Sequence, residues 1–337
     1  MGRGVNRGAD VGVDGDVGVD VTLVVPVRDE EATVDDLARS IVDQVVAPDA
    51  VVFVDGGSTD RTAAVLRTWA ARRPSWRVLD AGPATPGRGR NVGIAAAATT
   101  WVALTDAGIE LDAHWLERLV AVAGHDPSVD LVHGHHEPAL GDGVGRWAAL
   151  AYVPAPRPTG RGPVRDGSVA SCLLRRSAWQ AVGGFPDLRA AEDVAFLRAL
   201  ATAGHRRATA PEATVTWQLP PDLAGTFRRL RTYSRVNVVA GEQAHWHHGV
   251  AHQYLVAAPF LLLATRRRAW QAVPALGFAA RVVLSVLRRR EGRPAWWALD
   301  PRRLAGVGVV LLTCDAATFA GWADALRDGH HAPRAGG

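Results

Sequence analysis

The sequence contains no lysine, so arginine alone supplies its 38 basic side chains. Sugar nucleotidyltransferases carry a glycine-rich, lysine-bearing loop after their first strand, and the absence of lysine excludes that class. The formal net charge is +4, and alanine, glycine and valine are abundant. The preference for arginine therefore reflects the composition of the whole chain, and we expect no nucleic-acid partner.

Cysteine is also scarce, and the chain start lacks the apolar stretch of a signal peptide. Cys172 and Cys314 are the two cysteines, which excludes a disulfide framework and fits a reducing compartment. Residues 1–20 repeat glycine, valine and aspartate without an apolar core. We predict a disordered arm there and a catalytic part that stays in the cytoplasm.

Strand and helix patterns alternate from residue 21 to about 135, which predicts an α/β fold with a mostly parallel sheet covered by helices on both faces. Short β-branched runs predict strands at Val21–Val27, Val51–Val54, Trp76–Leu79, Trp101–Thr105 and Val129–Val132. Helical spacing follows at about 30–44, 90–98 and 114–123, and another helix, capped by Ser58 or Thr59, is predicted to run to about Arg73.

The second half divides at about residue 245. Residues 154–167 are rich in proline, glycine and arginine, which predicts a mobile loop over the site. A strand at 169–174, a helix starting near Glu192 and a long helix over 222–240 follow. We therefore predict a catalytic domain over 21–245 and an apolar, basic helical segment over 249–328.

Carboxylates follow three of the predicted strands. Glu30 follows the first, Asp55 ends the second and Asp106 follows the fourth. Asp after a strand is often only a helix cap or turn residue, but three such turns would meet at one edge of a parallel sheet, where ligands bind. Arg88 and Arg90 lie in a glycine-rich turn at a helix start, which favours a diphosphate.

These segments together resemble the family 2 glycosyltransferases, which adopt the GT-A fold. The resemblance covers roughly residues 20–242. Its motifs, in chain order, are VVPVRDEEAT, VFVDGGSTDRT, GRGRNVGIAAA, LTDAGIELDAHWLERL, SAWQAVGGFPD and AAEDVAFLRAL. Several motifs in the right order are more specific than a single glycine pattern.

The resemblance implies roles for individual residues. Asp193 takes the place of the catalytic base, and Glu192 beside it helps the acceptor to bind. Asp106 matches the first aspartate of the DxD motif, which joins Mn²⁺ or Mg²⁺ to the donor phosphates. The nucleotide-binding positions are Pro26, Glu30, Asp55, Arg88 and Arg90. The acceptor-side positions are Gly183, Gly184 and Trp217.

Two departures from the family pattern stand out. Gly108 replaces the second aspartate of DxD, so the number of metal ligands stays open. The same replacement leaves an alternative function, a degenerate domain that binds nucleotide sugar without turnover. The Gln-x-x-Arg-Trp motif of processive relatives is absent, so we expect transfer of single sugars. A Rossmann oxidoreductase is excluded because the first strand leads into Pro26-Val27-Arg28 rather than a glycine fingerprint.

The expected activity is the inverting transfer of a sugar, of the hexosyltransferase kind, from a UDP- or GDP-linked donor to an acceptor hydroxyl. A cell-envelope glycan or lipid is the expected acceptor. Apolar stretches at 249–264, 269–287 and 304–322, flanked by arginine, predict association with the cytoplasmic face of the cell membrane. Arg281 and Asp315 interrupt two of them, so a soluble helical domain in the cytoplasm is the alternative.

Overall fold

The computed structural model describes residues 19–139, 143–165, 168–188, 191–239, 241 and 247–329. Nearly all of the predicted N-terminal arm (residues 1–18) and the predicted domain boundary at residue 245 therefore lie outside the described residues. The division into an arm, a catalytic domain and a C-terminal segment stays a prediction.

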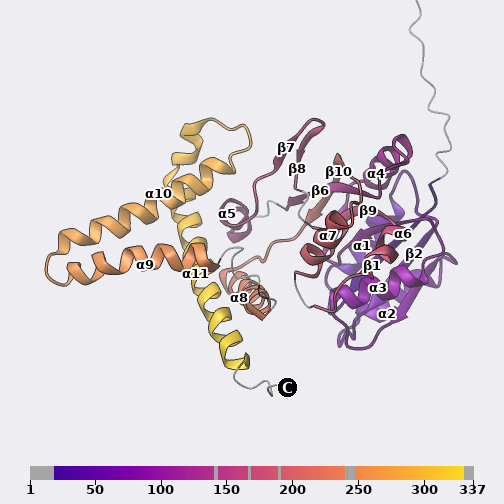
Figure 1. Ribbon diagram of the computed structural model, residues 1–337, viewed down its shortest axis with the longest axis horizontal. Helices are drawn as coiled ribbons and strands as arrows, with labels where there is room; N and C mark the ends of the chain where they lie inside the picture. Colours follow the sequence, from indigo (N-terminus) through magenta and orange to yellow (C-terminus); the bar gives the residue numbers. More distant parts are fainter. Residues whose placement is uncertain are drawn as a thin grey trace, which may run out of the picture.

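Eight strands form one sheet in the order β3-β2-β1-β4-β9-β6-β10-β5 (Figure 1). Strands β1 to β4 pair in parallel, and β6 pairs in parallel with β10. The antiparallel strands are β9, between β4 and β6, and β5 at the edge. The bounds are β1 (Val21–Val27), β2 (Ala50–Asp55), β3 (Trp76–Asp80), β4 (Trp101–Thr105), β5 (Ile109–Leu111), β6 (Leu131–Pro138), β9 (Ser171–Arg175) and β10 (Arg207–Trp217). The predicted mostly parallel α/β fold is confirmed.

Helices cover both faces of this sheet because alternate strand residues point to opposite sides. Leu23 and Val25 of β1 belong to one buried cluster and Val24 to the other. The first face is covered by α1 (Val34–Val42), α2 (Thr62–Ala70) and α4 (Trp115–His125). The second is covered by α3 (Pro86–Ala96), α6 (Arg176–Ala181) and α7 (Glu192–Thr202). The loops between these elements meet at the carboxyl ends of the strands.

Two local predictions are wrong. The segment predicted as a loop over 154–167 contains a two-stranded hairpin, β7 (Arg157–Thr159) and β8 (Gly162–Val164). Helix α2 is not capped by Ser58 or Thr59. The carboxylate of Asp60 accepts the backbone N–H of Thr62 at 2.9 Å instead.

The remaining helices lie beside the sheet, and all but α5 follow it in the chain. They are α5 (Val144–Ala151), α8 (Leu223–Val239), α9 (His247–Ala264), α10 (Ala272–Arg288) and α11 (Pro301–Gly329), with short 3-10 turns at Arg268–Gln271 and Ala295–Leu299. Helices α5, α10 and α11 share a third buried cluster, and α11 packs along α8. Helices α9 and α10 form a hairpin that projects away from the sheet (Figure 1).

The two charges that interrupt the apolar stretches pair with each other. The guanidinium of Arg281 on α10 donates to both carboxylate oxygens of Asp315 on α11, at 2.6 and 2.8 Å. The hydroxyl of Tyr254 on α9 donates to the same carboxylate at 2.9 Å. The polar groups within these apolar helices therefore bind one another and tie the three helices together.

Candidate active site

The turns after β1 and β2 interlock at the edge of the sheet. Asp55 is buried at the end of β2, opposite Val27 of β1, and its Oδ1 accepts from the backbone N–H and the hydroxyl of Ser58 at 3.1 and 2.5 Å. Asp29 accepts from the backbone N–H of Thr59 at 2.7 Å. A side chain of the first turn thus accepts a hydrogen bond from a backbone N–H of the second, which holds both turns in place.

Glu30 is fixed in the same way. Its backbone N–H donates to the Thr62 hydroxyl at 2.8 Å, and its Oε2 accepts from the Thr33 hydroxyl at 2.8 Å. Burial raises the pKa of Glu30 above the ordinary value for glutamate, and the nearby Asp106 adds to the increase. Pro26, near the end of β1, is half-buried and packs against Gly89 in the first half of α3.

Arg90 is the central cation of the site. It is 3 % exposed, and its terminal nitrogens bind Asp106 at 2.5 Å and Glu192 at 2.6 Å. Burial alone would lower the pKa of Arg90, but the two carboxylates outweigh it and raise the pKa. One guanidinium therefore joins the β4 turn to the start of α7, which confirms that these distant segments meet.

Asp193 lies beside this ion-paired group at the first turn of α7. Burial raises the pKa of Asp193 although Arg90 opposes the shift, and Ser168 donates a hydrogen bond to the carboxylate. Burial likewise raises the pKa of Glu192. The preceding residue, Ala191, has a left-handed backbone with φ 63°, which directs the chain into the helix. A carboxylate with a raised pKa is suited to accept a proton near neutral pH.

The Gly183-Gly184 turn packs against α3. Both glycines have positive φ, at 78° and 84°, and a Cβ on Gly184 would lie 2.8 Å from Asn91 Oδ1. Asn91 donates to the Phe185 carbonyl at 2.8 Å and accepts the Phe185 N–H at 2.9 Å. Asn91 lies within a quoted motif, but sequence reasoning gave it no role, because a side chain that clamps a distant turn has no signal in local spacing.

Trp217 ends β10 beside Ile109, which follows the Asp106 turn. Its ring contacts Arg229 on α8, whose guanidinium carbon lies 5.4 Å from the ring centroid. Sequence reasoning missed Arg229, since one arginine among several on an amphipathic helix carries no distinguishing pattern. Arg88, on the first turn of α3, is exposed.

The described residues contain no group of three side chains that could hold a metal ion. Asp106 has one oxygen on Arg90, and its other oxygen has no described partner. Gly108 has φ 74°, and a Cβ there would lie 3.4 Å from Glu30 Oε2. The Asp106 carboxylate therefore fits a divalent cation that is bound by one carboxylate and by substrate phosphates. This is a common binding mode for Mg²⁺.

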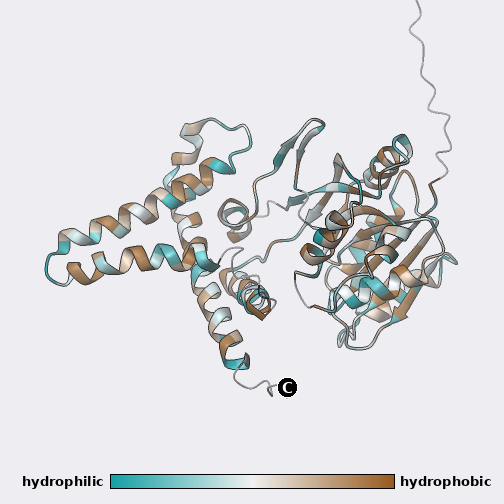
Figure 2. Ribbon diagram, viewed as in Figure 1, coloured by the Kyte–Doolittle hydropathy of each residue, from teal (hydrophilic) through white to brown (hydrophobic). Residues whose placement is uncertain are grey.

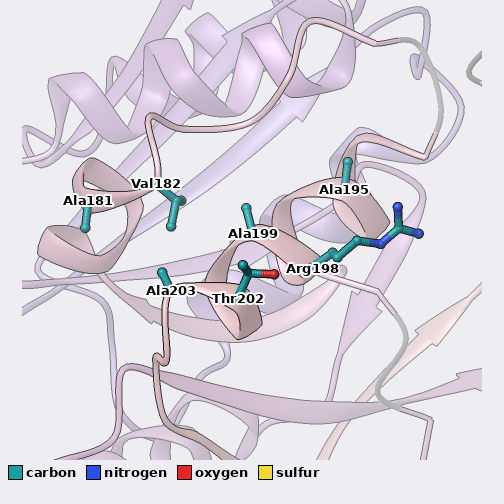
Figure 3. A pocket seen from close by; sticks show the side chains of 7 residues that line it. All are labelled: Ala181, Val182, Ala195, Arg198, Ala199, Thr202 and Ala203. Carbon is teal, nitrogen blue, oxygen red and sulfur yellow. The ribbon is translucent and has the colours of Figure 1, made fainter.

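A groove of about 490 Å³ lies elsewhere, between α6 and α7 (Figure 3). Its lining is mostly apolar and consists of Ala181, Val182, Ala195, Arg198, Ala199, Thr202 and Ala203. None of the predicted site residues belongs to this lining. The carboxylate-bearing edge, rather than this groove, gathers the groups that can do chemistry.

A sheet of this topology, with Arg90 joining the Asp106 turn to Glu192 at the start of α7, is that of the GT-A fold. Residues 22–182 match the sequence model described as glycosyl transferase family 2. Residues 22–182 of this chain are thus similar to a glycosyltransferase domain of family 2.

One similar solved structure supports this fold. The mannosyltransferase PcManGT from Pyrobaculum calidifontis, in complex with GDP-Man and Mn²⁺, is 21 % identical, with a TM-score of 0.51 over 91 % of this chain and 87 % of its own. TarS residues 1–349 from S. aureus, in complex with UDP, is 18 % identical over 92 % of each chain, with a TM-score of 0.48. No curated protein sequence matches the chain significantly.

Proposed function

We propose that this protein transfers a sugar, with inversion, from a nucleoside-diphosphate donor to an acceptor hydroxyl. One observation carries the proposal: the half-buried Asp193 carboxylate lies beside the Glu192–Arg90–Asp106 ion-paired group, at the sheet edge where α/β proteins bind ligands. The degenerate, nucleotide-binding domain is the alternative. A complete set of acid and base groups supports turnover rather than mere binding.

The chemistry assigns a separate task to each group. Asp193 accepts the proton of the acceptor hydroxyl as that oxygen attacks the anomeric carbon. Glu192 holds Arg90 in place and lines the acceptor side with Gly183, Gly184 and Trp217. Asp106 would hold the divalent cation, Mn²⁺ or Mg²⁺, which when bound neutralises charge on the leaving diphosphate.

On the donor side, the groups that bind the nucleoside differ from those near the phosphates. We assign the base and ribose to Pro26, Glu30 and Asp55, which lie on the interlocked β1 and β2 turns. We assign the diphosphate end to Arg88 and Arg90 at the start of α3, where backbone N–H groups point toward an anion. UDP- and GDP-linked sugars are both candidate donors.

A thermal-shift screen tests donor binding directly. A ligand that binds the folded state raises the melting temperature by mass action, by an amount set by its concentration relative to Kd. UDP or GDP at about 100 times Kd should stabilise the protein by about 2.7 kcal/mol, and Mn²⁺ should increase the shift. No shift with any nucleoside diphosphate, with or without Mn²⁺, would contradict the assignment of the site.

We further propose that the α9–α10 hairpin contacts the cytoplasmic face of a membrane that carries a glycan or lipid acceptor of the cell envelope. Two helices, Arg268–Arg288 and Pro301–Asp328, are long and apolar enough to span a bilayer. Only 17 % of the apolar window in the first is buried, against 50 % in the second, which packs on α8 and α5.

The surface of the hairpin supports this proposal. Figure 2 shows apolar residues along both of its helices. Leu255 and Leu262 on α9 and Leu276 on α10 are 70–72 % exposed. Helices of 17 and 18 residues are about 26–27 Å long, close to the thickness of a bilayer core. An apolar hairpin exposed on this scale is stabilised by lipid rather than by water.

A further inference from the structure

The charge of Arg90 is already balanced by two carboxylates, so Arg90 alone cannot neutralise a diphosphate. Both of its terminal nitrogens bind carboxylates, and its Nε is buried without a partner. The site edge also carries the carboxylates of Glu30, Asp55 and Asp193. A phosphate that enters this edge therefore needs a cation whose charge is not already balanced.

Arg229 on α8 is such a cation. Its Nε donates to the Tyr233 hydroxyl at 3.1 Å and its Nη1 to the Gln218 carbonyl at 3.4 Å, and both acceptors are neutral. Within the described ranges it has no ion pair with a carboxylate, and its Nη2 has no hydrogen bond. The side chain as a whole is half-buried.

The surroundings hold the guanidinium in place without neutralising it. Its carbon lies 5.4 Å from the Trp217 ring centroid and 5.7 Å from that of Tyr233. Two further hydrogen-bond donors nearby, Trp217 Nε1 and the Tyr152 hydroxyl, are buried without any partner. Unpartnered buried donors are costly in a folded protein, and an incoming acceptor group would satisfy them.

This group faces the candidate active site. Trp217 pairs with Ile109, three residues beyond Asp106. Arg229 acts on Glu30 electrostatically, since its charge opposes the rise that burial causes in the pKa of that carboxyl. His136, whose ring meets Trp217 edge to face, adds no positive charge because burial lowers its pKa to about 4.

We propose that Arg229, together with Trp217 and Tyr152, forms a subsite that binds a phosphate group. The Arg229 guanidinium donates to a phosphate oxygen, and Trp217 Nε1 and the Tyr152 hydroxyl are the neighbouring donors for the same anion. The phosphate comes either from the diphosphate of the donor or from a phosphorylated acceptor. The choice between these sources rests on the proposed function, whereas the subsite itself does not.

The test uses the full chain and isothermal titration calorimetry with inorganic phosphate, UDP, GDP, uridine and guanosine, in the presence of Mn²⁺. The variants are Arg229→Gln, Tyr152→Phe and, as a matched control, Arg228→Gln, which removes an exposed arginine from the same helix. Melting temperatures establish that each variant is folded. Losing one charge-assisted hydrogen bond should weaken phosphate binding about 10- to 100-fold in Arg229→Gln. Tyr152→Phe should lose less, and Arg228→Gln less than about threefold.

The outcomes separate the two sources. Weaker binding of UDP or GDP with unchanged binding of uridine and guanosine assigns the subsite to the donor. Unchanged nucleotide binding, with phosphate binding lost at saturating nucleoside diphosphate, assigns it to the acceptor. Phosphate binding that depends on Arg229 in a protein that binds no nucleotide would support the subsite and contradict the proposed function. The subsite would be overturned if Arg229→Gln bound phosphate and nucleotide as tightly as the parent does. It would also be overturned if neither protein bound phosphate or nucleotide.

Discussion

At the residue scale, the site balances buried carboxylates against one buried arginine. Asp193 and Glu192 both have raised pKa values because burial disfavours their charged forms, while Arg90 partly compensates. Such an arrangement costs stability and provides a base whose proton affinity is higher than that of an exposed aspartate. Two predictions separate the catalytic role from the structural one.

Asp193→Asn should reduce transfer about 10²- to 10⁴-fold while leaving donor affinity unchanged, because an amide cannot accept the proton. In the parent, kcat/KM should fall as the pH drops through the raised pKa of Asp193. Steady-state kinetics across pH, with calorimetry of donor binding, measure both effects.

The same substitution should also stabilise the fold at neutral pH. Because the pKa of Asp193 is higher in the folded state than in the unfolded chain, the stabilising contribution of its protonated form is lost as the pH rises through the folded pKa. The Asn variant should therefore melt above the parent at pH 7, and the gap should close toward about pH 4. An Asn variant that is less stable at pH 7 would indicate that the carboxylate has a structural role.

Arg90→Gln should destabilise the protein by about 3–5 kcal/mol, because it leaves the buried Glu192 without a counter-charge. Urea unfolding measures the loss, which should shrink at acidic pH as Glu192 becomes protonated. Arg88→Gln is the matched control, since Arg88 lies on the same helix but is exposed. Equal effects of the two substitutions would refute the central role of Arg90.

At the scale of elements, α3 organises the site. It carries Arg90 and Asn91, and it lies close to its neighbours because it is rich in glycine. A Cβ on Gly87 would lie 2.3 Å from the Pro186 carbonyl, and one on Gly93 would lie 2.3 Å from Val24 Cγ1. The glycines that suggested a phosphate loop in the sequence therefore also serve helix packing.

Gly87→Ala should destabilise the protein by about 1–3 kcal/mol and weaken donor binding, because the 183–186 turn must move. Gly277→Ala is the control: nothing lies within 4 Å of its Cβ position, and alanine favours a helix by about 1 kcal/mol. Thermal unfolding of both variants gives the comparison. A Gly87→Ala variant as stable as the parent would mean that the contact adjusts freely.

Local sequence patterns predicted the parallel part of the fold well, because buried β-branched strands and amphipathic helices have clear periodicities. They predicted the strand at 169–174 (β9) but not its antiparallel pairing within the sheet, and they did not predict the β7–β8 hairpin, since strand direction and pairing depend on distant partners. Candidate site residues came from motifs, and the structure joins Arg90, Asp106 and Glu192 directly. Asn91 and Arg229 were missed because their contacts lie far away in the sequence.

At the scale of the whole molecule, the hairpin of α9 and α10 is joined to the catalytic part through α11. Ser285 on α10 donates to the Leu150 carbonyl in α5, and Arg289, just after α10, donates to the Val153 carbonyl. Arg231 on α8 pairs with Asp324 on α11 at 2.6 Å. These contacts fix the base of the hairpin, while the rest of it remains exposed. The proposed membrane contact would therefore orient the candidate active site.

Replacing Leu255, Leu262 and Leu276 together by serine should reduce binding to anionic phospholipid vesicles by about 100-fold or more, because each buried leucine contributes about 1.5–3 kcal/mol. Vesicle sedimentation of the full chain measures the loss. Val45→Ser is the control, since Val45 is 57 % exposed on the catalytic part. A parent protein that stays soluble, monodisperse and active without lipid or detergent would contradict membrane association.

The central claim is that the edge around Asp193 transfers sugar from a nucleotide donor. Release of nucleoside diphosphate from UDP- and GDP-linked sugars, with water as the acceptor of the sugar and Mg²⁺ as the cation, tests it most directly when followed by ³¹P NMR in the parent, Asp193→Asn and Asp55→Ala. We predict release by the parent, binding with release slowed at least about 100-fold in Asp193→Asn, and weakened donor binding in Asp55→Ala. Release by Asp193→Asn at the parent rate, or a parent that binds donor without ever releasing diphosphate, would contradict the account.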